Sequence, residues 1–188
     1  QAIAPGVWSD WKDSCLWDLY YRSYDRLMLV HERAEVDHDP AGWVKKKVAD
    51  LLHSEIDKAL IEKHFQLLPQ GYVLYTRWEH VLAHLRMSAS LNEKEIKFHW
   101  FENQRRGCSE LILVGRDQPG LFAQVAGALM SFNLTILTAQ LNTRQDGVVC
   151  AVFRLGNPNG RQYFQREDFP RIESFIKKVL EKKVDLQE

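Results

Sequence analysis

The spacing of apolar residues changes near Ser90, and that change limits the folds open to this chain. Before Ser90 the apolar residues recur every three or four positions, the period of an amphipathic helix. After Ser90 the apolar runs are short and either alternate with polar residues or are continuous, as in strands. A helical stretch followed by a strand-rich stretch predicts an α+β protein.

Three helices are expected in the first 90 residues. They cover residues 8–30, 44–59 and 78–87, and breaks that contain proline and glycine separate them. The third helix turns Val81, Leu82 and Leu85 inward. Residues 1–90 are therefore predicted to form a helical region in which tryptophan and tyrosine supply much of the buried area.

Residues 91–188 are predicted to form a second domain in the order strand, helix, strand, strand, helix. After an extra strand at 95–101, the expected elements are a strand at 110–114, a helix at 119–132, strands at 134–143 and 148–155, and a helix from about Asp168. The run 110–114 is continuously apolar, as in a strand buried on both faces. An Asp-Gly hairpin joins the last two strands.

This order is that of a ferredoxin-like βαββαβ unit whose last strand, at best residues 184–188, is short or missing. Either that strand lies beyond the end of the chain, or the strand at 95–101 takes the exposed edge. An open edge favours pairing, so association through it is expected.

Charge and cysteine content exclude several classes of function. Lys+Arg and Asp+Glu both number 25, so no net positive field attracts nucleic acid or an anionic membrane surface. No apolar run approaches the roughly 20 residues of a membrane helix. The three cysteines, Cys15, Cys108 and Cys150, fit neither a disulfide framework nor a zinc site, which favours the cytoplasm. A nucleic-acid-binding RRM shares the strand order, but its third strand here offers only Phe153 and Arg154.

The turn Arg116–Phe122 has two interpretations. In the first it serves stability alone, because Asp117 caps the following helix, Pro119 presets φ and Gly120 tolerates a tight bend. In the second it binds a ligand. A helix N-terminus offers unpaired N–H groups to a carboxylate, Gly120 lets a ligand approach the backbone, and Asp117 can meet an ammonium group. A free α-amino acid carries both charges and suits this turn.

Residues 116–155 resemble an ACT domain, the small-molecule sensing module of amino-acid metabolism. The matching positions are Asp117, Pro119, Gly120, Leu121, Asn133, Ala139, Leu141, Thr143, Asp146 and Gly147. The resemblance implies an effector site between this turn and the start of a neighbouring domain's second strand. The implied effector-binding residues are Arg116, Asp117, Gln118, Pro119, Gly120, Leu121 and Phe122, with Asn133, Thr135 and Ile136 on the second side. One ACT unit is then half a site, and ACT–ACT pairing or a homodimer is expected.

The wider chain resembles the family of bifunctional PII uridylyltransferase/uridylyl-removing enzymes. Residues 8–27, 64–87 and 107–122 carry this resemblance, which covers nearly the whole chain. It corresponds to the segment after the catalytic HD domain plus the first ACT domain. The resemblance implies a regulatory, glutamine-sensing fragment of an enzyme that transfers UMP from UTP, with magnesium, to the PII protein and removes it again. The alternative left open is an ACT binding or dimerisation module of another amino-acid-metabolism protein.

No catalytic residue, metal site or cofactor is expected within this fragment. The Gly-Ser step that precedes the metal-binding aspartates in such transferases does not occur. His31 and the pair His38-Asp39 are interpreted as a solvated helix end. His80 and His84 have a spacing that can bind zinc, but the sequence positions no acidic or cysteine partner, so we predict packed histidines.

Overall fold

The computed structural model describes residues 39–103, 108–156 and 166–182, together with four helical residues, Leu16, Leu19, Tyr20 and Ser23. The rest of the expected first helix, His31, His38 and the closing segment 184–188 lie outside the described residues. The chain divides into two compact units, 1–44 and 45–188. The second unit contains the whole sheet, and a domain boundary at residues 90/91 stays a prediction.

The helical stretch is made of four described helices: α2 (Pro40–Leu52), α3 (Lys58–Leu67), α4 (Tyr72–Tyr75) and α5 (Trp78–Ala89). The single helix expected over 44–59 is wrong, because α2 ends at Leu52 and a new helix starts after Asp57. The Asp57 carboxylate accepts the N–H of Ala59 at 2.8 Å and caps α3, the helix-starting role that short acidic side chains prefer. In α5, Val81 and Leu85 are buried as predicted.

Four strands form one antiparallel sheet in the order β1-β2-β4-β3. Their bounds are β1 (Ile96–Asn103), β2 (Cys108–Arg116), β3 (Thr135–Thr143) and β4 (Val148–Gly156). The remaining elements are α6 (Leu121–Ser131) between β2 and β3, then the 3-10 turn η2 (Arg166–Asp168) and α7 (Phe169–Leu180). The layout is α+β and consistent with a ferredoxin-like ACT domain, as predicted.

Strand β1 occupies the sheet edge beside β2, where a ferredoxin-like unit would place its closing strand. It pairs antiparallel with β2 along its full length, from Ile96 opposite Gly115 to Asn103 opposite Cys108. Of the two alternatives raised by the sequence, the extra strand therefore takes the exposed edge. Gly115 permits this pairing, because a Cβ there would lie 2.8 Å from Cγ1 of Ile96.

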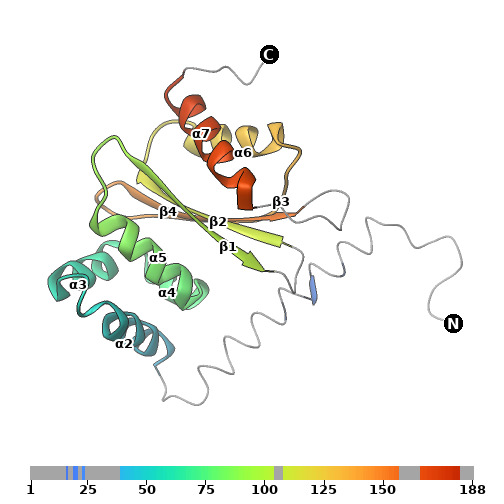
Figure 1. Ribbon diagram of the computed structural model, residues 1–188. Coiled ribbons are helices and arrows are strands. Elements are labelled where there is room, and N and C mark those ends of the chain that lie inside the picture. The colour runs from blue at the N-terminus through green and yellow to red at the C-terminus, as the bar shows by residue number, and fades with distance from the viewer. Residues whose placement is uncertain are drawn as a thin grey trace, which may run out of the picture. The chain divides into compact units, whose positions relative to one another are not determined.

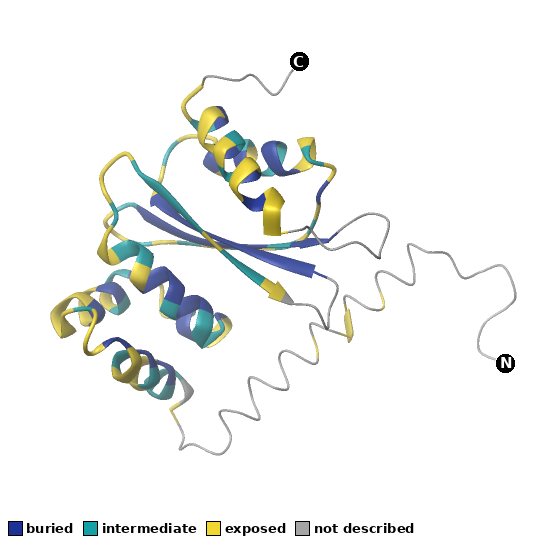
Figure 2. Cartoon of the chain, viewed as in Figure 1, coloured by how far each residue is buried: buried dark blue, intermediate teal, exposed yellow. Residues whose placement is uncertain are grey.

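Helices cover both faces of the sheet (Figure 1). Helices α6 and α7 pack on one face, where Leu111, Leu113 and Phe153 join their apolar residues in the main core. On the other face, Ala83 of α5 packs against Ile112 and Val152. Strands β2 and β4 are thus buried along most of their length (Figure 2), which confirms the prediction for 110–114. Among the described helices, none is long and apolar enough to cross a membrane.

Candidate functional site: the turn between β2 and α6 and the cleft beside it

The turn predicted to bind an effector connects the end of β2 to the start of α6. Gly120 is the N-cap residue of α6 and has a left-handed φ of 78°, a conformation that glycine adopts without strain. No side chain caps this helix. The expectation that Asp117 caps it is therefore wrong, because the exposed Asp117 lies three residues before the N-cap position. The interpretation in which the Asp117 carboxylate serves stability by capping α6 is therefore excluded.

Two hydrogen bonds tie the turn to the hairpin between β3 and β4. The backbone N–H of Asp117 donates to the carbonyl of Gly147 at 2.8 Å. The guanidinium of Arg116 donates to the carbonyl of Asp146, also at 2.8 Å. The direction of the turn is thus fixed by one backbone bond and one bond from the Arg116 side chain, and the Asp117 side chain has no part in them.

A cleft of about 450 Å³ lies beside the turn. The start of β1, the turn and the end of α7 enclose it. Its lining residues are Glu93, Lys94, Glu95, Ile96, Arg116, Gln118, Lys177, Leu180 and Glu181. Three of these side chains are cationic, three are carboxylates, one is an amide and two are aliphatic. Such a lining can pair with both charges of a zwitterion and still offer an apolar contact.

The structure brings only part of the predicted site to this cleft. Arg116 and Gln118 line it, whereas Leu121 is buried in the core and Phe122 stacks on Phe153 with a centroid distance of 5.7 Å. Asp117, Pro119 and Gly120 are exposed. The turn therefore presents two surfaces, one toward the cleft and one toward solvent.

The second half of the predicted site lies at the other end of α6. Asn133, Thr135 and Ile136 follow this helix, which has 11 residues and so a length of about 16 Å at 1.5 Å per residue. Asn133 and Thr135 are exposed and Ile136 is half-buried. Within one chain the two groups do not meet, so a site that uses both needs a second ACT unit, as the resemblance implies.

Sequence reasoning missed the residues that complete the cleft, above all Lys177 and Glu181 of the α7 end and Glu93 before β1. The lysines at the end of α7 are visible in the sequence but fit a solvated helix end equally well. Only the pairing of β1 with β2 brings the segment before β1 next to the turn. The sequence raises this edge position for the strand at 95–101 as one of two alternatives, but no local pattern decides between them.

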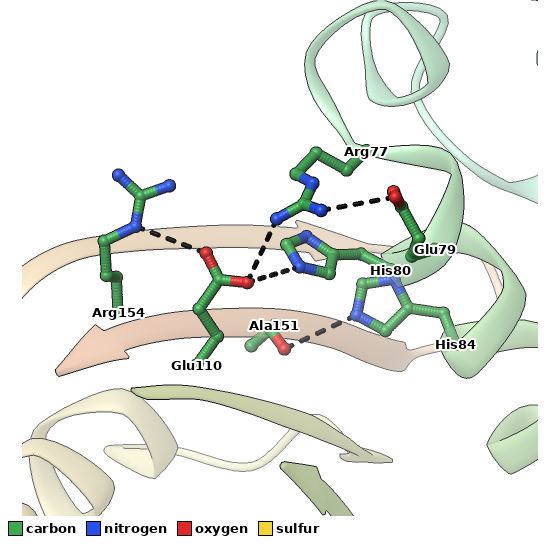
Figure 3. Close-up of polar contacts among 7 residues, drawn as sticks. All are labelled: Arg77, Glu79, His80, His84, Glu110, Ala151 and Arg154. Carbon is green, nitrogen blue, oxygen red and sulfur yellow. Dashed lines mark hydrogen bonds and ion pairs between the residues drawn. The ribbon is translucent and has the colours of Figure 1, made fainter. Parts of the chain in front are cut away.

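A buried polar cluster on the other face of the sheet joins α5 to β2 and β4 (Figure 3). The carboxylate of Glu110 is 1% exposed and accepts hydrogen bonds from His80 Nε2 at 2.9 Å, Arg154 Nε at 3.3 Å and Arg77 at 3.5 Å. Burial by itself raises the pKa of Glu110, but the hydrogen bond from His80 and the nearby cations outweigh it and lower that pKa to about 2. Glu110 is therefore ionised at neutral pH.

His84 extends this cluster toward α4. Its Nε2 lies 3.4 Å from the carbonyl of Ala151, and its Nδ1 lies 2.8 Å from the hydroxyl of Tyr72. Burial lowers the pKa of His84 to about 3, so the ring is neutral, with Nε2 donating and Nδ1 accepting. His80 and His84 are packed, as predicted. In the parts of the chain that the structure describes, no three metal-ligating side chains come together.

The fold first defines the class of this region: an α+β protein with a layout consistent with a ferredoxin-like ACT domain. No model of a known protein family matches the sequence. The resemblance seen in the sequence is nevertheless confirmed by curated relatives. Over nearly its whole length, the chain is similar to proteins named bifunctional uridylyltransferase/uridylyl-removing enzyme.

The relative from Erythrobacter litoralis is 27% identical over 180 residues, which cover 94% of this chain and 19% of that protein. The relative from Novosphingobium aromaticivorans is 27% identical and covers 99% and 20%. The relative from Cereibacter sphaeroides is 28% identical and covers 100% and 20%. The chain thus spans about one fifth of the length of the curated relatives it matches.

Proposed function

We propose that this chain is the regulatory, glutamine-sensing segment of a uridylyltransferase/uridylyl-removing enzyme of nitrogen regulation, with an ACT domain as the effector module. The similarity to such enzymes over nearly the whole chain supports the proposed parent enzyme. The ferredoxin-like layout supports an ACT domain as the effector module. The buried thiol of Cys150 fits a cytoplasmic location, where thiols stay reduced.

The observation that carries the proposal is the mixed-charge cleft at the turn. Arg116 and Lys177 can receive the α-carboxylate of an amino acid, while Glu93 and Glu181 can receive its ammonium group. The amide of Gln118 is a partner for a side-chain amide such as that of glutamine. Ile96 and Leu180 can contact the methylene groups between them. The cleft volume lies within the usual range for small-molecule sites.

The mechanism would be differential binding. If glutamine binds one arrangement of the ACT units more tightly, it biases the parent toward that arrangement. Transfer of UMP from UTP to PII, with magnesium, and its removal would then take place in parts of the parent other than this chain. The chain itself would supply recognition of glutamine and the response to it.

Pairing with a second ACT unit is part of the proposal. Strand β3 is an edge strand with exposed apolar side chains, Leu137 at 36% and Leu141 at 43% exposure. Its start carries Thr135 and Ile136, so a neighbour that pairs along this edge would place its own turn near them. The exposed apolar edge of β3 therefore suits a second ACT unit or a second copy of the chain.

Isothermal titration of the 188-residue chain with glutamine tests the site. Arg116→Gln or Lys177→Gln should weaken glutamine binding about tenfold or more, because each removes a charged partner of the carboxylate. The matched control is Lys178→Gln on the next residue of α7, which does not line this cleft and should bind as wild type does. Equal affinity in all four proteins would refute the assignment.

A thermal-shift panel separates the alternatives. A glutamine sensor gains stability with glutamine by mass action, whereas an ACT module of another amino-acid-metabolism protein would respond to a different amino acid. UTP and an oligonucleotide complete the panel and should give no shift. A shift with the oligonucleotide alone would reject both amino-acid interpretations.

A further inference from the structure

We propose that the hairpin loop Arg144–Gly147 transmits the state of the effector turn to helix α3, and that Arg144 is the positioning residue of this loop. The inference rests on the proposed function for the role of the turn, and it names how that site would be coupled to the helical stretch of the chain. The observation behind it is that this one loop is bonded to the turn on one side and to α3 on the other.

On the turn side, two consecutive residues of the turn bond to two consecutive carbonyls of the loop. The N–H of Asp117 donates to Gly147 and the guanidinium of Arg116 donates to Asp146, each at 2.8 Å. Arg116 also lines the cleft. A ligand that draws the Arg116 guanidinium toward its carboxylate therefore acts on a side chain that holds the loop.

On the helix side, the loop reaches the last turn of α3. The N–H of Gln145 donates to the carbonyl of Leu67 at 2.9 Å. This carbonyl belongs to the helix end, where carbonyls lack partners within the helix. The Arg144 guanidinium lies 3.3 Å from Nδ1 of His64, which is almost fully buried in the same helix. Since arginine only donates, Nδ1 of His64 accepts this bond.

Between its two sides the loop is stiff. Arg144 holds the Asp146 carboxylate by two parallel contacts, Nε to Oδ1 at 3.0 Å and Nη2 to Oδ2 at 2.7 Å. The side chain of Arg144 is only 10% exposed, so solvent screens this pair less than an open surface pair. The N–H of Gly147 also donates back to the carbonyl of Arg144 at 2.9 Å. A displacement at Asp146 and Gly147 is therefore passed to Arg144 and Gln145 instead of being absorbed.

Hydrogen–deuterium exchange of the whole 188-residue chain, with and without glutamine, tests the coupling. In the wild type, glutamine should slow exchange in the hairpin and in the C-terminal turn of α3 by roughly three- to tenfold. This is the effect expected when one or two hydrogen bonds are strengthened. Arg144→Gln should keep the slowing at the turn and lose it in α3. Circular dichroism checks that each variant is folded.

Arg86→Gln is the matched control. Arg86 forms the same kind of bidentate ion pair with Glu55, with both contacts at 2.8 Å, but this pair does not touch the hairpin. The control should therefore keep the glutamine effect in α3. If α3 responds to glutamine in Arg144→Gln as in the wild type, the coupling proposal is wrong although glutamine sensing stands.

A ligand-free arm keeps the two proposals separate. Arg116→Gln removes the bond to Asp146 and should speed exchange at Gln145 and in the last turn of α3 by roughly two- to tenfold without any ligand. Faster exchange supports the coupling even if glutamine does not bind, in which case only the proposed effector fails. Unchanged exchange in α3 overturns the coupling whatever glutamine does.

Discussion

At the scale of single residues, buried charge distinguishes this protein from a simple apolar sandwich of helices and sheet. Glu110 is ionised inside the protein because His80, Arg154 and Arg77 surround it. Desolvation offsets much of the gain from such a cluster, so its larger effect is on which residues meet. An α5 shifted along the sheet would take His80 and Arg77 away from the buried Glu110 carboxylate and leave only Arg154 of β4 beside it. The cluster therefore fixes the register of α5 against β2.

The two neutral buried histidines predict how stability depends on pH. Burial lowers the pKa of His64 and of His84 from 6.5 to about 3, so below pH 6.5 the unfolded chain binds protons that the folded chain does not. Their contribution to the free energy of unfolding is complete above pH 6.5. It decreases as the pH falls toward 3, by about 1.4 kcal/mol per pH unit for each histidine.

Urea unfolding at several values between pH 7.5 and 5 measures this slope. His84→Gln should reduce the slope by the share of one histidine, because glutamine cannot take up a proton. A slope that is the same in the wild type and in His84→Gln would show that His84 is not kept neutral by burial. Glu110 does not contribute in this range, since its ordinary pKa is 4.5 and its folded pKa is about 2.

At the scale of elements, strand β1 substitutes for a closing strand, and Gly115 makes the close pairing possible. Gly115→Ala places a methyl group 2.8 Å from Cγ1 of Ile96, so β1 must shift outward. The expected loss is about 1–3 kcal/mol of unfolding free energy. Ile96→Ala should rescue much of this loss, and a double-mutant cycle in urea measures the coupling.

Gly147→Ala is the control for this prediction. Its φ of 78° is strained for alanine, but nothing lies within 4 Å of an added Cβ. It should therefore be destabilising in a way that Ile96→Ala does not rescue. If Ile96→Ala leaves the cost of Gly115→Ala unchanged, contact between the two side chains is not the cause.

The elements also show how far the sequence predicts this structure. The spacing of apolar residues and the residue types in the turns are local signals. They correctly predict the α+β class, the buried run 110–114 and the hairpin. The helix over 44–59 was predicted too long because its apolar period runs through the cap at Asp57. The cleft could not be predicted, because Glu93, Arg116 and Lys177 come from three segments that only the sheet order brings together.

At the scale of the whole molecule, helix α5 covers one face of the sheet. Ile112 and Val152 are buried against Ala83 of α5, and Val114 and Cys150 are buried on the same face. A chain that begins at residue 91 would expose this apolar face. Monomers rarely expose apolar side chains in one contiguous patch. We therefore expect the helices and the sheet to unfold together.

The last prediction compares a chain of residues 91–188 with one of residues 39–188. The shorter chain should bind the dye ANS, elute from a sizing column as larger species and unfold at a lower urea concentration, because α5 no longer covers the sheet. The longer chain should unfold in one transition seen alike by fluorescence and circular dichroism. A shorter chain that binds no dye and unfolds at the same urea concentration would instead establish an independent domain boundary at residues 90/91. In that case the contacts of α5 with the sheet contribute little to stability, and the Glu110 cluster serves register alone.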